Sequence, residues 1–541
     1  MKNWMKKGLL SVMIPIIISG LFSVPAFAAL TEPEKPVPWL RPLYDLGDFA
    51  AKGLIGAITA AYPPPPGLSR EFADPLLPTG TGTFLTAPAG EKTWHLGYAK
   101  ASLFEDYAGD IYDGKHYVMG TVDFVGKRRT TDVMDDQMLR ATAMSDGSGR
   151  GAVVFISVDA YGITSADIGK IRKAALALDG MKDVVSLNVS SIHQHSVIDT
   201  LGMGGNLLAA LASNPLAMYT GWTTLYSGKN PAFMAHLVET AAHAAQQAVG
   251  NMTPGTMTYS KADISDFILD RRTPVSFDPD LHRLRFVPDD GSAETWLCNM
   301  ALHPVGTGLS PCVVTGDYPA YMEKAIHEAR GANFQMLQGA MMAIDPLYDP
   351  PSLPEAERFV ELERVGRRIA QRLLDLPLSA ETPVEPILNI AHRNYVLPID
   401  NPLHLLMFRL GILEANGRKK NLWGTKVELY TEVGYVEFGA SLAAAMVPGE
   451  LDGSLAFGGQ LTKEQAWNGW VWEFTPMKDM VPPERKLLVF GLTNDLTGYM
   501  IQPNDISHFI VFENEEINAA SKEAAPRILE AFQALLEDIL P

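Results

Sequence analysis

Strand-like apolar runs that alternate with helical stretches constrain the fold of this chain more than any other feature of its sequence. Residues 151–158 (GAVVFISV) form a continuous apolar run rich in β-branched side chains, which is typical of a buried strand. Such alternation predicts a mixed α/β fold in which β-sheets are flanked by helices. The helical patterns lie at residues 168–178, 233–249, 355–374 and 520–539.

The first 28 residues have the pattern of a secretory signal peptide. Three lysines within the first seven residues precede an apolar stretch, residues 9–24, and Ala26-Phe27-Ala28 matches a small-x-small cleavage site. The stretch contains Pro15 and is shorter than the ~20 residues of a membrane-spanning helix, which favours cleavage over a membrane anchor. We therefore expect a secreted or periplasmic protein.

A proline-rich segment separates this signal from the rest of the chain. Residues 29–92 include four consecutive prolines at 63–66, and this composition predicts an extended N-terminal arm with one short helix near residues 46–61. No internal repeat and no second shift of composition follow. We expect residues 93–541 to form one large domain.

Composition and charge exclude several classes of protein. Hydrophobic residues make up 47% of the chain and charged residues 20%, which provides for a packed core and argues against disorder. The 62 acidic and 44 basic side chains give a formal charge of −18, so nucleic acid is not an expected partner. Cys298 and Cys312 are too few for a disulfide scaffold and leave two interpretations open, one bridge or two free thiols.

Four of the strand-like runs are each followed by a side chain that can bind a metal ion. In open α/β sheets, residues just beyond the carboxyl ends of strands line the crevice where ligands bind. The four candidates are His193, His303, Glu450 and Tyr499, which follow the runs 184–192, 296–302, 438–447 and 487–492, respectively.

The pair His193 and His195 has a further geometric meaning, because side chains two residues apart point to the same side of an extended backbone. A His-x-His pair alone is weak evidence, since buried histidines with satisfied hydrogen bonds are common. Together with His303 and Glu450, the pair fits catalytic zinc, which takes about three nitrogen and oxygen ligands and keeps a position for water. Tyrosine is an uncommon ligand, so chemistry supports Tyr499 least. An amidohydrolase barrel is not expected, because its His-x-His lies near the start of the barrel, not about a hundred residues into it.

The motifs around these residues occur in a specific order. The first is Ile192-His193-Gln194-His195-Ser196, followed by Leu302-His303-Pro304, Val447-Pro448-Gly449-Glu450 and residues 494–500 (NDLTGYM). They resemble, in the same order, the Thr-His-Thr-His-Ser, Val-His-Pro, Val-Pro-Gly-Glu and Asn-x-Tyr-x-Gly-Tyr-Val motifs of the neutral, non-lysosomal ceramidases. The resemblance extends from about Leu96 to the C-terminus and implies a ceramidase-like zinc hydrolase domain.

The resemblance also implies roles for individual residues. It implies that His193, His303, Glu450 and Tyr499 bind one catalytic zinc ion. His195 would then lie beside the metal, where it stabilises the oxyanion or passes a proton to the leaving nitrogen. Arg272, in Arg272-Thr273-Pro274, matches a family arginine close to the substrate and is expected to bind a polar head or a carboxylate; a surface salt bridge is the alternative.

The chain departs from the family at the active-site serine. Residues 338–346 (QGAMMAIDP) correspond to the family's Gly-Asp-Val-Ser-Pro-Asn segment and place Asp345 where the serine lies. A carboxylate beside a zinc-bound water suggests direct attack by metal-activated water, with Asp345 orienting or deprotonating it. The alternative is a turn cap before Pro346. A second departure is that we expect no immunoglobulin-like domain after the last helix.

These expectations combine into one leading hypothesis, a secreted zinc-dependent hydrolase that cleaves a linear amide of an N-acylated, lipid-like substrate. Peripheral contact with a membrane surface accompanies it, and the sequence does not specify the oligomeric state. One alternative is a zinc esterase or other hydrolase on a non-ceramide substrate. Another is a non-catalytic binding protein on the same fold, since fold does not imply function.

Overall fold

The structure of the protein, a computed structural model, describes most of the chain from Arg41 to Leu540. The described residues are 41–61, 71, 78–120, 126–206, 209, 227–306, 312–347, 353–421, 425–509 and 516–540. The predicted signal peptide and much of the proline-rich arm lie outside them. Within these ranges, no helix combines the length and the apolar character needed to cross a membrane.

The larger of two β-sheets has nine strands in the order β11-β9-β8-β6-β1-β3-β4-β5, with β13 beside β6. Most neighbours are antiparallel, but β4 and β5 run parallel, as do β9 and β11. The strands are β1 (Trp94–Ser102), β3 (Met138–Ser145), β4 (Ala152–Val158), β5 (Val184–Ser191), β6 (Thr253–Asp263), β8 (Asp280–Pro288), β9 (Thr295–Met300), β11 (Asn333–Gln338) and β13 (Thr382–Pro383).

The second sheet has five strands in the order β14-β16-β17-β19, with β15 beside β16, and β17 runs parallel to β19. Its strands are β14 (Leu388–Ile399), β15 (Gly417–Lys419), β16 (Val427–Phe438), β17 (Leu442–Met446) and β19 (Lys486–Phe490). Three two-stranded pairs complete the strands, namely β2 (Asp132–Val133) with β10 (Val313–Val314), β7 (Ile268–Asp270) with β12 (Ile344–Pro346), and β18 (Glu450–Leu451) with β20 (Tyr499–Met500).

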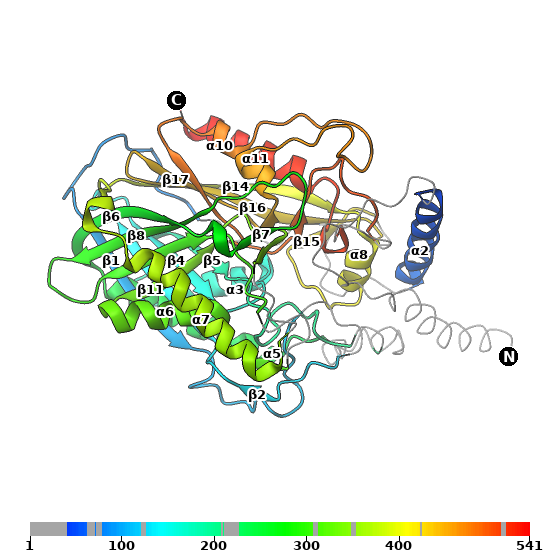
Figure 1. Cartoon of the computed structure of the whole chain (residues 1–541), viewed down its shortest axis with the longest axis horizontal. Helices are drawn as coiled ribbons and strands as arrows, with labels where there is room; N and C mark the ends of the chain where they lie inside the picture. The colour runs from blue at the N-terminus through cyan, green and yellow to red at the C-terminus, as the bar shows by residue number, and fades with distance from the viewer. Residues whose placement is uncertain are drawn as a thin grey trace.

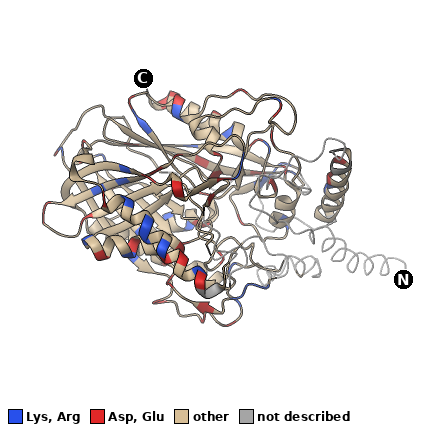
Figure 2. Cartoon of the chain, in the orientation of Figure 1, with Lys and Arg blue, Asp and Glu red and all other residues tan. Residues whose placement is uncertain are grey.

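The two sheets pack face to face, and helices cover their outer faces (Figure 1). Large apolar side chains from both sheets, among them Trp94, Phe155, Phe438 and Phe490, form the core between them. On the large sheet lie α3 (Ser165–Leu176), α5 (Pro231–Gly250), α6 (Asp317–Arg330) and α7 (Glu355–Leu374); on the small one lies α11 (Ala524–Ile539). Figure 2 marks residues of both charges along the outer helix α7. The predicted mixed α/β fold, with sheets flanked by helices, is confirmed.

The remaining helices are α2 (Arg41–Ala61), α8 (Pro402–Arg409), α9 (Gly453–Phe457) and α10 (Met477–Met480), with the 3₁₀ turns η3 (Ser265–Phe267), η5 (Leu378–Ala380) and η6 (Glu516–Asn518). Helix α2 contains the short helix predicted near residues 46–61 of the arm but is longer, because it begins at Arg41, and it packs against α8.

Two details differ from the sequence expectations or decide between them. The run 438–447 is not one strand: β16 ends at Phe438, and Gly439, with a φ of 65°, turns the chain before β17 begins at Leu442. A positive φ costs a glycine little, which allows this tight turn.

The structure also decides between the two interpretations of the cysteines. Cys298 and Cys312 form no disulfide, and burial raises the pKa of Cys298 to about 12, which makes this thiol unreactive.

Candidate metal centre

The two sheets meet at the carboxyl ends of their parallel strands. The amide of Ser191, at the end of β5, donates to the carbonyl of Leu492, which follows β19, over 3.1 Å. Asn494 returns a hydrogen bond to the carbonyl of Val189 over 2.8 Å. Because these bonds tie the ends of β5 and β19 together, the polar residues that follow strands of both sheets converge on one place.

His193 and His303 are each oriented by a backbone carbonyl. Nδ1 of His193 donates to the carbonyl oxygen of Tyr161 over 2.8 Å, and Nδ1 of His303 donates to that of Ile344 over 2.8 Å. A donor at Nδ1 leaves Nε2 as the ring nitrogen available to a metal ion, which is the usual outer-shell arrangement of metal-binding histidines.

The carboxylate of Glu450 lies between these two rings. Its Oε1 is 3.4 Å from Nε2 of His193, and its Oε2 is 3.1 Å from Nε2 of His303. Glu450 pairs with Tyr499 in the parallel β18–β20 ladder, so the backbone places the predicted tyrosine directly beside the carboxylate. Tyr499 is 6% exposed.

His195 completes a group of three buried histidines. Its ring centroid is 4.9 Å from that of His193 and 5.9 Å from that of His303, and one nitrogen from each of the three lies within 4.8 Å of the others. Both ring nitrogens of His195 are buried, and neither makes a hydrogen bond of good geometry with the described residues. Buried polar atoms are normally paired, and the backbone of Gly120 acts on this ring as a hydrogen-bond partner, so one ring nitrogen remains available to a group bound at the centre.

Burial and Glu450 set the charge of these rings. Burial lowers the pKa of His193 to about 4 and that of His195 well below its usual range. Burial also lowers the pKa of His303, but the hydrogen bond and charge of Glu450 outweigh it and leave that pKa raised. His193 and His195 are therefore neutral at pH 7, and neutral imidazole is the form that binds metal ions.

The distances fit a tetrahedral cation. Bonds of ~2.0–2.1 Å to nitrogen and oxygen separate the ligand atoms of such an ion by roughly 3.3 Å. The distances from Glu450 to the two Nε2 atoms, 3.4 and 3.1 Å, match this separation. The donor set of His193, His303 and Glu450 therefore fits a divalent metal ion, with Tyr499 and His195 beside it.

Asp345 lies behind His303. Its Oδ1 is 3.7 Å from Nδ1 of His303, the nitrogen on the side of the ring away from Glu450, and its Oδ2 is 2.6 Å from Nε of Arg271. A base acting on water at the metal was expected on the Nε2 side of the ring. The carboxylate instead lies on the Nδ1 side of the ring, where its charge acts on His303 without a hydrogen bond.

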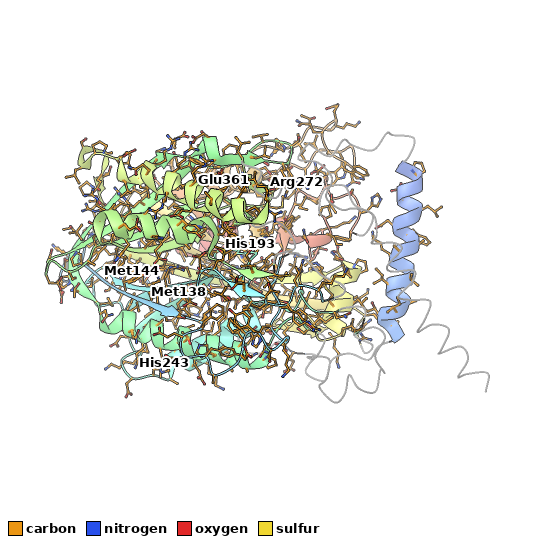
Figure 3. All side chains as sticks on the ribbon, turned by 60° about the horizontal axis from the view of Figure 1, so that its bottom comes forward. Met138, Met144, His193, His243, Arg272 and Glu361 are labelled. Atoms are coloured by element: carbon orange, nitrogen blue, oxygen red, sulfur yellow. The ribbon has the colours of Figure 1, made fainter. Side chains whose placement is uncertain are left out.

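Arg272 is held by an ion pair. Its guanidinium donates to Oδ2 of Asp505 over 2.6 Å, and its amide donates to Asp270 over 2.9 Å. Figure 3 labels both Arg272 and His193, and the latter lies within the body of the molecule. Because Asp505 neutralises Arg272, binding a substrate carboxylate here requires exchange of that partner.

Positive φ angles surround the centre. Among the described residues, a non-glycine φ above zero occurs at His193 (62°), Ala343 (60°), Leu492 (50°) and Asn494 (67°), all in loops that follow strands at the centre, and also at Asp317 and Lys92. Such conformations cost free energy and persist where the surrounding structure enforces them, often at functional sites.

A second group of potential ligands does not fit a metal ion. Asp278, Asp280 and His282 lie close together, but Lys486 pairs with Asp278 at 2.9 Å and Lys261 pairs with Asp280 at 2.6 Å. Both carboxylates are already neutralised, so this group serves as a contrast to the histidine centre.

A pocket lined mainly by apolar atoms borders the centre. Glu450 and Tyr161 form part of its wall, and Phe408 of α8 and Leu413 are among its apolar side chains. Sequence reasoning missed Tyr161, whose carbonyl orients His193 and whose ring centroid lies 4.2 Å from that of His193. The sequence feature that could have identified Tyr161 is its position just beyond β4, the strand that runs parallel to β5.

Comparison with known proteins places the fold. No protein-family model matches the sequence, and no curated protein matches it. Among solved structures, the chain is similar to the neutral ceramidase from Pseudomonas aeruginosa, with 14% identity and a TM-score of 0.59 over 83% of this chain and 74% of that one. A ceramidase complexed with C2 gives the same identity and TM-score over 83% of this chain and 75% of that one. The chain therefore has a ceramidase-like fold.

Proposed function

We propose that this protein is a zinc-dependent hydrolase that cleaves the linear amide bond of an N-acylated, lipid-like substrate. The observation that carries the proposal is the placement of Glu450 between the Nε2 atoms of His193 and His303, in the wall of an apolar pocket. The likeness to ceramidases supports it at the level of the fold. The predicted signal peptide supports export.

His193, His303 and Glu450 would hold the ion, with Tyr499 as the fourth ligand. When bound, zinc polarises a carbonyl group and lowers the pKa of a coordinated water toward ~7. The backbone carbonyls of Tyr161 and Ile344 keep both imidazoles turned toward Glu450. The pocket wall excludes bulk water and accommodates an acyl chain.

His195 acts on the oxyanion in this proposal. Burial lowers its pKa, so its neutral ring is a poor proton donor but a good hydrogen-bond donor to the oxygen that gains charge. One such donor typically contributes ~10²–10³ in rate.

Asp345 is a positioning residue in this proposal, because its carboxylate faces Nδ1 of His303. Outer-shell partners of this kind typically change metal affinity or activity ~10–100-fold. Asp345→Asn should therefore weaken zinc binding and leave the pH profile of the bound enzyme in place. If Asp345 were a catalytic base, Asp345→Asn would instead keep its zinc and lose the acidic limb of the pH profile.

The decisive experiment combines metal analysis with a substrate panel. We expect about one zinc ion per chain, loss of activity with chelator, and faster cleavage of long-chain N-acyl amides than of matched esters. His303→Ala should lose zinc and activity while keeping its circular dichroism spectrum. The matched control, His282→Ala in the second group, should keep both. Amidase activity in a folded, metal-free sample would overturn the proposal, and a preference for esters would favour the esterase alternative.

A further inference from the structure

Helix α2 has a second apolar side that the described residues do not cover. Its inner side buries Ala51, Ile55 and Ile58 against an apolar cluster that includes residues of α8. On the other side, Leu46 exposes 64% of its surface and Phe49 exposes 76%. These are large apolar groups in a conformation that leaves them in water.

The exposed residues around Leu46 and Phe49 are uncharged except for Asp45, which lies at the edge of this side. Successive residues of an α-helix are about 100° apart, so the exposed residues share one side of α2. The further exposed residues of this side are Pro42, Ala50, Gly53, Gly56, Ala57 and Ala60. A surface helix normally carries polar residues opposite its buried stripe. We call Leu46, Phe49 and these small residues the outer face of α2.

The charged residues of α2 that the structure describes lie beside this side of the helix, and each has a pairing partner. Lys52 pairs with Asp48, and Asp45 pairs with His508 at 2.9 Å. The outer face therefore offers an apolar surface with one carboxylate, Asp45, at its edge, in a protein with a formal charge of −18. Its complement is an uncharged apolar phase, not an anionic surface.

A loop that packs on the segment carrying His508 also exposes apolar side chains. Trp470 and Val471 are 44% and 47% exposed, and the carbonyl of Trp470 accepts a hydrogen bond from Asn504 over 2.9 Å. The same segment carries His508, which binds Asp45 of α2. Tryptophan is enriched where proteins meet the interface of a membrane.

Helix α2 itself lies close to the pocket and, in the sequence, close to the predicted targeting segment. Helix α8, which packs on α2, contributes Phe408 and His404 to the pocket that reaches Glu450. The apolar segment 9–24 is followed by residues 25–40 and then by α2. Cleavage at the predicted site would leave residues 29–40 ahead of α2.

We propose that α2 is an interfacial helix that docks the protein on an uncharged or zwitterionic lipid surface by inserting Leu46 and Phe49. The helix lies in the plane of the interface, as amphipathic anchors do. The inference deepens the proposed function, because it names a lipid surface as the source of the substrate. Docking is measured without turnover, so its failure is distinguishable from failure of the amidase proposal.

The test is flotation of the full chain with phosphatidylcholine vesicles. Burying one leucine or phenylalanine side chain changes a partition coefficient by about tenfold or more, so the double variant L46S/F49S should bind at least tenfold more weakly. The matched control is Val360→Ser, which alters a residue 69% exposed on α7 and should keep wild-type binding. Activity on a short-chain, water-soluble amide should be the same in all three proteins.

Several results would overturn the inference. Wild-type protein that does not float with phosphatidylcholine vesicles contradicts it, and so does a double variant that floats like the wild type. Stronger binding to phosphatidylserine vesicles than to phosphatidylcholine vesicles would contradict the proposed preference for an uncharged or zwitterionic surface. Dimers in sedimentation velocity that disappear in L46S/F49S would assign the outer face to a second copy of the chain.

Discussion

Replacing Glu450 by glutamine should remove the stabilisation that zinc gives to the folded protein. The substitution keeps the shape of a side chain that is 2% exposed but removes the charge that lies 3.4 and 3.1 Å from the Nε2 atoms of His193 and His303. Loss of a ligand charge should weaken binding by at least the ~100-fold at the upper end of outer-shell effects.

The expected size follows from mass action. Free zinc at 100 times its dissociation constant stabilises the native state by ~2.7 kcal/mol, and a 100-fold weaker site at the same zinc concentration gains only ~0.4 kcal/mol. Unfolding entropy of about 2.1 cal/mol/K per residue, over the roughly 440 residues that the structure describes, gives ~0.9 kcal/mol/K. Zinc should therefore raise the Tm of the wild type by ~3 °C and that of Glu450→Gln by ~0.5 °C.

Differential scanning calorimetry of chelated and zinc-loaded samples measures this difference without any substrate. His282→Ala is the control, because the carboxylates of its group are paired with Lys261 and Lys486; its shift with zinc should equal that of the wild type. An equal zinc shift in Glu450→Gln and wild type would refute the assigned centre. A shift lost only in His282→Ala would move the site to the second group.

Three further predictions test the neighbourhood of the centre. His195→Ala should keep one zinc per chain and lose ~10²–10³ in kcat, whereas loss of zinc, measured by elemental analysis, would make His195 a ligand. Ala415→Phe, in the pocket wall, should lower kcat/KM for long acyl chains and spare short ones; an equal loss for both in a chain-length series contradicts the acyl pocket. Burial raises the pKa of Asp317 to about 7. A carboxyl whose folded pKa is raised contributes stability below its unfolded pKa of ~3.9 and loses it as pH rises through the folded value, so Asp317→Asn should gain about 2–3 kcal/mol relative to wild type between pH 5 and pH 8. Urea unfolding at both pH values checks this, and a constant difference contradicts it.

From the sequence alone, the strand-end pattern predicted that most residues of the centre lie close together. His193, His303 and Glu450 each follow a strand by a few residues, and parallel strands have their carboxyl ends at one edge of a sheet. The sequence did not contain the reason why two sheets share that edge. Hydrogen bonds between the loops after β5 and β19 join them, and backbone pairing between distant segments leaves no mark in side-chain periodicity.

Asp345 shows what a linear correspondence misses. Its position in the sequence matched that of a family serine, which suggested a group beside the reacting water. The pairing of β12 with β7 instead turns the carboxylate toward Arg271 and the Nδ1 side of His303. Which side of a ring a neighbour occupies depends on the β12–β7 register, and a three-residue strand such as β12 (Ile344–Pro346) is too short for its register to be predicted from a hydrophobic pattern.

The orientation of the centre depends mainly on backbone atoms. The carbonyls of Tyr161 and Ile344 set both imidazole rings, and the β18–β20 ladder places Tyr499 beside Glu450. Any side chains that preserve the strands also preserve these groups, because carbonyl oxygens are present at every residue. A chain can therefore differ from the ceramidases at most positions, with 14% identity, and still share their fold. Backbone groups carry no signature in the sequence, which is why the resemblance rested on a few short motifs when no match over the whole sequence was found.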